Sequence, residues 1–138
     1  MNRIQSLLKL SKEELFSAEI LLQNQCYRAS VSRSYYAMYH LVQALLTAKN
    51  INVKTHKGLI QQFGQHFIKT EELPQDLSRI LSDTFSLRQL SDYDETILIT
   101  PRQAEIILEH LKCFIDETNN WLTKAGILYL IKRLIKNF

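Results

Sequence analysis

The chain has 138 residues, of which 46% are hydrophobic and 22% are charged, and its formal net charge is +3. This length and composition are typical of one soluble globular domain with a single core, and the mild positive charge is compatible with an anionic partner without requiring one. No run of about 18 apolar residues occurs, which excludes a membrane-spanning helix.

The first predicted helix covers residues 4–25, where leucine and alanine recur with helical spacing. Ser11 and Glu14 form an S-x-x-E pattern, which is typical of a capping box at a helix N-terminus. We therefore expect the regular helix to begin at Ser11, with the first ten residues forming a separate turn or arm. Charges interrupt the opening sequence MNRIQSLLKLSKEEL, so no signal peptide is expected.

Three further helices are predicted between turn-forming residues. The second helix covers Tyr27 to Lys49, and the asparagines of the sequence KNINVKT end it. The third covers about His56 to Lys69, with its leucine, isoleucine and phenylalanine side chains turned inward. Pro74 fits the first turn of the fourth helix, which continues to about Ser91.

An extended loop is predicted over residues 92–99, followed by a fifth helix. Thr100 and Pro101 supply an N-cap and an N1 proline, and Gln103 completes a second capping box. The apolar positions of this helix run from Ile106 to Trp121. Because no segment sustains an alternation of apolar and polar residues, the predicted fold class is all-α.

The end of the chain has a different character. Gly126 interrupts the helical pattern before the sequence ILYLIKRLIKNF, in which cationic residues are interspersed among aliphatic ones. We predict a helical bundle over residues 1–124 and a basic amphipathic C-terminal helix over 125–138. The apolar stripe of this last segment would pack onto a neighbouring subunit or lie on a membrane surface, and we favour packing.

The two cysteines, Cys26 and Cys113, stand apart from each other and form no C-x-x-C pair. We expect free, buried thiols in a reducing cytosol rather than a disulfide, and hence a cytoplasmic protein. The four histidines form no H-x-x-H or H-E-x-x-H pattern, and no carboxylate cluster accompanies them. No metal site and no cofactor are therefore predicted. The sequence also contains no glycine-rich phosphate loop and no convincing helix-turn-helix.

The sequence SRSYYAMYH, residues 32–40, carries the candidate chemistry. Arg33 and His40 are seven residues apart, which places them on one face of a helix with Cα atoms about 10 Å apart. Tyr36 and Ala37 lie between them on the same stripe. The small side chain of Ala37 is expected to leave room for a partner chain or a ligand to approach the backbone.

An arginine and a histidine together suit the cleavage of RNA without a metal. The guanidinium binds phosphate oxygens and stabilises charge in the transition state, while the imidazole moves protons when the 2′-hydroxyl attacks the phosphate. Side chains on a helix lean toward its N-terminus, so Arg33 leans away from His40. Two such helices around a twofold axis would close the site better than one. A histidine that is simply hydrogen-bonded on a half-buried face is the alternative.

Three segments in register carry a resemblance to a known family: ASVSRSYYAMYHLVQALL, THKGLIQQF and LRQLSDYD. They resemble the HEPN superfamily (higher eukaryotes and prokaryotes nucleotide-binding domain), and more specifically its small stand-alone prokaryotic branch. The defining motif of that family is an arginine followed after four to six residues by a histidine, and six residues separate Arg33 from His40. The resemblance covers roughly residues 11 to 122.

The resemblance implies an up-and-down bundle of four to five helices that forms a homodimer through the second helix. It also implies, for active members, metal-independent endoribonuclease activity with Arg33 and His40 as catalytic residues. Many relatives are toxins that a minimal nucleotidyltransferase neutralises as antitoxin. In some relatives the partner adenylylates a tyrosine two residues after the histidine; Val42 occupies that position here, so this chemistry does not carry over.

Other positions of the motif segments are candidates for contacting or supporting the binding of RNA or a nucleotide. Ser34 follows Arg33, where many active members have asparagine or aspartate, and Arg88 lies four residues before Asp92, a spacing that allows an ion pair. His56 opens a helix, where it would attract an anion, cap the helix or pack. The complete set of these supporting candidates is Ser34, Tyr36, His56, Arg88, Asp92 and Tyr93.

Two other functions remain open at this point. The protein would be a non-catalytic module that holds a nucleotide or RNA and assists a nucleotidyltransferase through the same face. Alternatively, it would be a helical interaction protein whose tyrosine-rich stripe forms a dimer seam.

Overall fold

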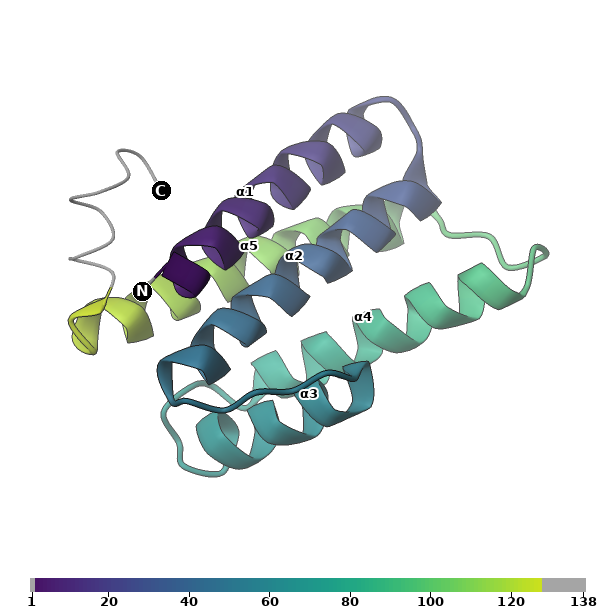
Figure 1. Ribbon diagram of the computed structural model, residues 1–138. Coiled ribbons are helices and arrows are strands. Elements are labelled where there is room, and N and C mark those ends of the chain that lie inside the picture. Colours follow the sequence, from purple (N-terminus) through teal and green to yellow (C-terminus); the bar gives the residue numbers. More distant parts are fainter. Residues whose placement is uncertain (1, 128–138) are drawn as a thin grey trace.

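The computed structural model describes residues 2–127, and within this range the chain forms five α-helices and no strand. The helices are α1 (Asn2–Gln23), α2 (Tyr27–Ala48), α3 (His56–Phe63), α4 (Asp76–Tyr93) and α5 (Pro101–Lys124). A π-helical turn, η1 (Gly64–Ile68), continues α3. Helices α1, α2, α4 and α5 run up and down beside one another, and the short α3 packs at one end (Figure 1). The predicted all-α bundle is confirmed.

Helix α2 is the centre of the bundle, because it packs against α1, α4 and α5. Its inward side chains are fully buried and include Tyr35, Met38, Leu41 and Leu45. Phenylalanines of α3, η1 and α5 complete the core at the end where α3 packs. The ring of Phe63 stacks on those of Phe67 and Phe114. Burial on this scale is the main stabilising contribution to a domain of this size.

Helix α1 does not begin at Ser11, so this part of the sequence prediction is wrong. The helix runs unbroken from Asn2, and Ser11 lies in its middle, 1% exposed. Upstream, Ile4, Leu7 and Leu8 are buried in the core and continue the apolar stripe by about two more turns. The burial of these side chains outweighs the weaker preference of a serine for the N-cap.

Two buried serines join α1 to α2. The hydroxyl of Ser11 donates to the carbonyl oxygen of Ala37 at 3.0 Å, and the hydroxyl of Ser30 on α2 donates to the carbonyl oxygen of Ala18 on α1 at 2.8 Å. Ala18 and Ala37 are themselves fully buried. The small size of Ala37 therefore allows α1 to approach closely, which corrects the expectation that it leaves room for a ligand or partner chain.

The helix ends follow local chemistry closely. Thr100 caps α5 with the reciprocal capping box that the sequence predicts, in which Gln103 takes part. Helix α4 starts two residues after Pro74 and reaches Tyr93, which leaves a loop over residues 94–99. Arg28 at the start of α2 fixes the approach to this loop, because its guanidinium donates to the carbonyl oxygens of Ser91 and Ile97.

Both cysteines are free, but they are exposed, so the prediction that they are buried is wrong. Cys26 lies in the turn between α1 and α2, and Cys113 lies on the outward side of α5, beside the buried Phe114. The predicted helix over the basic C-terminal sequence lies outside the described residues from position 128 onward. Among the helices of residues 2–127, none is long and apolar enough to cross a bilayer.

Candidate functional site

Arg33 is held by a carboxylate of the neighbouring helix. Its Nη1 donates to both oxygens of Glu14 on α1, at 3.2 and 3.0 Å. The Arg33 side chain is 39% exposed and that of Glu14 only 16%, so the carboxylate lies at the base of the surface and the guanidinium extends above it. Sequence analysis assigned Glu14 to a helix cap and missed this role, because the pair depends on how α1 and α2 pack.

His40 lies two helical turns beyond Arg33 on α2 and is half-buried, which favours its neutral form. Burial is the largest influence and lowers the pKa of its imidazole below the usual value of 6.5, while the hydrogen bond to Gln43 and the charge of Glu14 raise this pKa and Arg33 lowers it. The Oε1 of Gln43 lies 3.4 Å from Nδ1, and a neutral ring with its proton on Nδ1 donates to it. Nε2 then carries the lone pair that accepts a proton.

The ring of Tyr36 connects Arg33 to a second arginine. The guanidinium carbon of Arg33 lies 5.1 Å from the centre of this ring, and that of Arg88, on α4, lies 4.9 Å from it. Both distances are within the range of cation–π contacts. The side chain of Tyr36, a candidate on sequence grounds, thus contacts an arginine of α2 and an arginine of α4.

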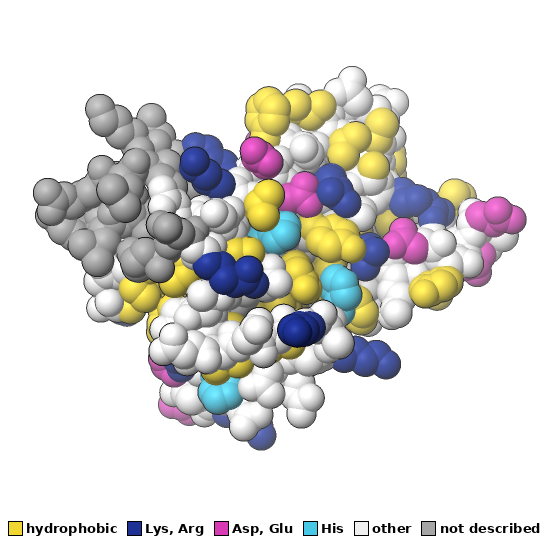
Figure 2. All heavy atoms as spheres, viewed as in Figure 1, with side chains coloured by type: hydrophobic (Ala, Val, Ile, Leu, Met, Phe, Trp, Pro, Cys, Tyr) yellow, Lys and Arg dark blue, Asp and Glu magenta, His cyan; other side chains and the backbone are white. Residues whose placement is uncertain are grey.

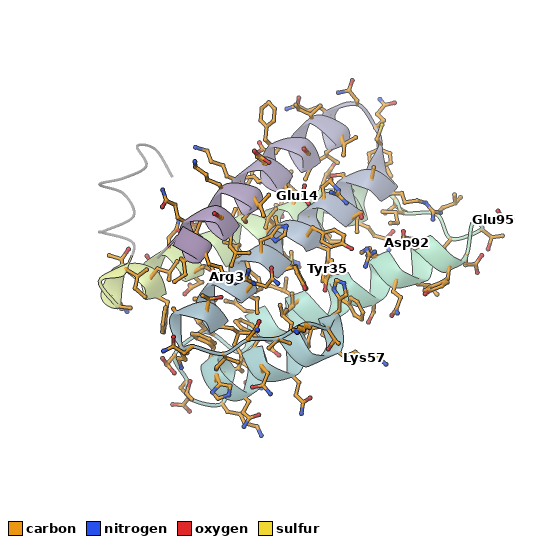
Figure 3. The ribbon with its side chains drawn as sticks, in the orientation of Figure 1. Arg3, Glu14, Tyr35, Lys57, Asp92 and Glu95 are labelled. Atoms are coloured by element: carbon orange, nitrogen blue, oxygen red, sulfur yellow. The ribbon has the colours of Figure 1, made fainter. Side chains whose placement is uncertain are left out.

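Arg88 and Asp92 form the ion pair that their spacing predicts. Nη2 of Arg88 lies 3.2 Å from Oδ2 of Asp92, one turn farther along α4. The Arg88 side chain is 20% exposed and that of Asp92 44%. The Nε of Arg88 is buried and has no hydrogen-bond partner among the described residues. Figure 3 shows Glu14 on α1 and Asp92 on α4, so the two carboxylates come from two helices that pack against α2.

His56 is part of an aromatic cluster and does not cap α3, since Thr55 is the N-cap and accepts from the backbone N–H of Gly58. The buried hydroxyl of Tyr35 lies 2.7 Å from Nδ1 of His56, and an imidazole with its proton on Nε2 accepts this hydrogen bond. The ring stacks on Phe85 with centroids 5.6 Å apart. Burial, and then the charge of Arg88, lower the pKa of His56, which keeps it neutral.

Two sequence candidates lie apart from this group. Ser34 is fully buried and its hydroxyl has no partner within residues 2–127, so it cannot contact RNA at the surface of this chain. Tyr93 is 85% exposed at the end of α4. Sequence analysis also missed Gln43 and Tyr39; the spacing of three residues from His40 to Gln43 could have indicated the former, whereas the contact of Tyr39 with His56 depends on the fold.

The candidate site is therefore one continuous surface across α1, α2 and α4. We call its members, Glu14, Arg33, Tyr36, His40, Arg88 and Asp92, the motif face. Figure 2 shows histidine, basic and acidic side chains gathered around hydrophobic ones over the middle of the molecule. Among the residues that the structure describes, no group of three histidine, cysteine or acidic side chains is placed to hold a metal ion.

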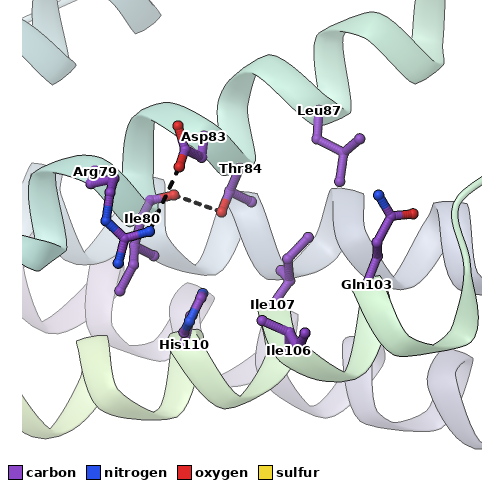
Figure 4. Close-up of a pocket in the computed structure, with 9 residues that line it drawn as sticks. All are labelled: Arg79, Ile80, Asp83, Thr84, Leu87, Gln103, Ile106, Ile107 and His110. Atoms are coloured by element: carbon purple, nitrogen blue, oxygen red, sulfur yellow. Dashed lines mark hydrogen bonds and ion pairs between the residues drawn. The ribbon is translucent and has the colours of Figure 1, made fainter.

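A separate cavity of about 160 Å³ lies between α4 and α5. Figure 4 shows it framed by the two helices, with the Arg79–Asp83 ion pair at its edge. Arg79 precedes Arg88 by two and a half helical turns and so points to the opposite side of α4. The lining combines four aliphatic residues with five polar or charged ones and shares no residue with the motif face: Arg79, Ile80, Asp83, Thr84, Leu87, Gln103, Ile106, Ile107 and His110.

The fold and the site define a class of protein: an all-α bundle with an arginine and a histidine on one face of its central helix. Comparison with known proteins agrees with this class. The family model for the HEPN domain matches residues 4–121, and the chain belongs to this family. The resemblance seen in the three sequence segments is thereby confirmed.

Curated relatives cover most of the chain. A protein named "Putative toxin MJ0142" from Methanocaldococcus jannaschii is 36% identical over 125 residues, which are 91% of this chain and 85% of that protein. A second, "Putative toxin MJ0605" from the same organism, is 38% identical and covers 82% of this chain and 84% of its own length. "UPF0332 protein glr0978" from Gloeobacter violaceus is 42% identical over 89 residues, 64% of this chain and 71% of that protein.

Proposed function

We propose that this protein is a metal-independent endoribonuclease and the toxin of a toxin–antitoxin pair, with Arg33 and His40 as its catalytic residues. The observation that carries the proposal is the position of Arg33 and His40 on one face of α2, with a partly exposed guanidinium and a half-buried imidazole whose pKa is lowered by burial. Membership of the HEPN family and the toxin names of two relatives support the same conclusion.

The chemistry follows from the two side chains. The Nε2 of His40 takes the proton of a 2′-hydroxyl, whose oxygen attacks the adjacent phosphorus. Arg33 donates hydrogen bonds to the non-bridging phosphate oxygens and stabilises the charge that develops there. The bond to the 5′-oxygen breaks, that oxygen takes a proton from an imidazolium, and the products are a 2′,3′-cyclic phosphate and a 5′-hydroxyl.

The active unit in this proposal is a homodimer formed through α2. In a twofold arrangement the two motif faces adjoin and surround one phosphodiester. The imidazolium that forms when His40 takes the proton of the 2′-hydroxyl then gives this proton to the leaving 5′-oxygen. A minimal nucleotidyltransferase is the proposed antitoxin, and RNA is the proposed substrate. The remaining sequence candidates, Tyr36, His56, Arg88 and Asp92, support this surface rather than carry out the reaction.

One observation favours a second function. Glu14 engages Arg33 with both carboxylate oxygens, which reduces the positive charge offered to a phosphate in the free protein. A protein that binds a nucleotide or RNA without cutting it, and that assists a nucleotidyltransferase, would tolerate this arrangement better than an enzyme would.

Cleavage of RNA in the presence of EDTA decides between the two. The purified protein and the variants His40→Ala and Arg33→Ala are incubated with total RNA. The matched controls are His110→Ala on α5 and Arg79→Ala on the far side of α4. The enzyme proposal predicts cleavage by the wild type and both controls, with 2′,3′-cyclic phosphate ends, and none by the two motif variants. Intact RNA at high wild-type concentration contradicts the enzyme and leaves binding.

A further inference from the structure

The motif face contains two arginines that contact the same tyrosine ring. Arg33 comes from α2 and Arg88 from α4, and both guanidinium carbons lie within 5.1 Å of the centre of the Tyr36 ring. The two cationic groups are therefore neighbours at the surface although 55 positions separate them in sequence. The two distances to the ring centre place the guanidinium carbons no more than about 10 Å apart, which suits successive charges along one nucleic-acid strand rather than two distant ligands.

Each of these arginines is occupied by one carboxylate in the free protein. Glu14 holds Arg33 and Asp92 holds Arg88, so the formal charge of the four groups sums to zero. Ion pairs at a partly exposed surface contribute little to stability, whereas phosphate forms charge-assisted bidentate hydrogen bonds with a guanidinium. An incoming phosphate can thus replace either carboxylate. The buried Nε of Arg88 is a further donor that no described residue uses.

We propose that Arg33 and Arg88 bind two neighbouring phosphates of a single RNA strand on either side of Tyr36, each phosphate taking the place of a carboxylate. The inference rests on the proposed function in that it takes RNA as the ligand, and it adds Arg88 as a positioning residue. A single strand fits because its exposed, flexible backbone can bring two successive phosphates to guanidinium groups that contact the same ring.

The same helix contains an internal control. Arg79 and Asp83 form an i,i+4 ion pair like that of Arg88 and Asp92, with 3.8 Å between Nη1 and Oδ2, but they lie on the opposite side of α4 beside the cavity between α4 and α5. Substitutions of Arg79 change the net charge by the same amount as substitutions of Arg88. Because Arg79 is the more exposed of the two, at 58% against 20%, the folding of both variants is compared before their binding.

The first experiment measures binding without cleavage. The probe is a short fluorescent 2′-O-methyl RNA oligonucleotide, which has no free 2′-hydroxyl to attack its phosphates, and fluorescence anisotropy is recorded over a series of salt concentrations. We expect Arg88→Gln to weaken binding about tenfold and to lower the slope of log affinity against log salt by about 0.7, the value for one phosphate contact of a single strand. Arg79→Gln should leave that slope unchanged.

The second experiment tests the replacement of the carboxylate. Asp92→Asn frees Arg88 from its partner, so the oligonucleotide should bind more tightly to it than to Asp83→Asn, which removes the same charge from the other side of the helix. A purely structural Arg88–Asp92 pair predicts the opposite result: Asp92→Asn would loosen α4 and weaken binding. This variant keeps the test decisive if Arg88→Gln does not fold, which circular dichroism establishes.

The outcomes separate this inference from the enzyme proposal. No binding by the wild type, equal salt slopes for Arg88→Gln and Arg79→Gln, or weaker binding by Asp92→Asn overturns the inference, even where the protein cuts RNA. Binding that depends on Arg88 without any cleavage of ordinary RNA supports the inference and overturns the enzyme proposal.

Discussion

Glu14 and Arg33 form an ion pair between the first two helices, with one guanidinium nitrogen donating to both carboxylate oxygens at 3.2 and 3.0 Å. This pair directs the arginine of the family motif toward α1. It also places a negative charge near His40, where it partly opposes the lowering of the His40 pKa by burial. The state of the arginine in the free protein is therefore set by a residue of α1, outside the motif.

Replacing Glu14 by glutamine should free Arg33 without changing the shape of the site. We expect RNA affinity to rise and the free energy of unfolding to fall by no more than about 1 kcal/mol, because the arginine of the pair is partly exposed to solvent. Glu13→Gln removes the same charge from an exposed neighbouring position and serves as the control. Equal affinities of the two variants for the 2′-O-methyl oligonucleotide would contradict the prediction.

The same substitution should also shift the titration of His40. The charge of Glu14 raises the pKa of His40 and that of Arg33 lowers it, while burial remains the largest influence. Glu14→Gln should therefore lower the pKa of His40, and Arg33→Gln should raise it. Proton NMR of the imidazole over a pH series measures both shifts, and shifts in the same direction for the two variants would refute the assigned electrostatic environment.

The two serines between α1 and α2 allow a test of helix packing. Ser11→Ala and Ser30→Ala each remove a buried hydrogen bond to a backbone carbonyl. We expect each to lower the free energy of unfolding by about 0.5–1.5 kcal/mol, as seen for typical hydrogen bonds. The two bonds lie at different levels of the helix pair, so the double variant should show the sum within about 0.5 kcal/mol in urea unfolding. A stability loss in the double variant that differs from the sum by more than this would mean that the two contacts are coupled.

The two capping boxes show what local sequence can predict. Thr100 and Ser11 carry the same pattern, but only Thr100 starts a helix. Pro101 follows Thr100 and fits only the first turn of a helix, whereas Ile4, Leu7 and Leu8 precede Ser11 with helical spacing. The decision at Ser11 depends on whether those side chains are buried in the bundle, which the four-residue pattern does not contain.

The contacts of the candidate site also fall into two kinds: those within one helix, which the sequence predicts, and those between helices, which it does not. The ion pair of Arg88 with Asp92 and the shared face of Arg33 and His40 follow from helical spacing alone, and both were predictable. The contacts of Glu14 with Arg33 and of Tyr36 with Arg88 join different helices, so they depend on the crossing of those helices in space. The burial of Ser34 likewise could not be predicted from the motif, because it depends on which side of α2 the core covers.

Stability should fall when the pH decreases from 7.5 to 5.5. Burial lowers the pKa values of His40 and His56 in the folded protein below the usual value of 6.5. As the pH falls through 6.5, the unfolded chain therefore takes up protons first, and the stabilisation that is complete above this pH is progressively lost. The carboxyl groups of Glu72 and Asp94, whose pKa values are lowered from 4.5 and 3.8, contribute only at lower pH.

Urea unfolding at the two pH values measures this dependence, and His40→Gln is the informative variant. Because glutamine does not titrate, the variant should lose less stability between pH 7.5 and 5.5 than the wild type loses. An unchanged difference between the two pH values would show that His40 is as easily protonated in the folded protein as in the unfolded chain.

The hydrogen bond between Tyr35 and His56 should couple the two residues energetically. Tyr35 is fully buried, and its hydroxyl lies 2.7 Å from Nδ1 of His56, so His56→Leu leaves a buried hydroxyl without this partner. We expect His56→Leu to cost about 2–3 kcal/mol and Tyr35→Phe about 1 kcal/mol. The double variant should cost about 1 kcal/mol less than the sum, because phenylalanine removes the unsatisfied group. Additive costs in the double-mutant cycle would mean that the hydroxyl finds another partner when the imidazole is absent.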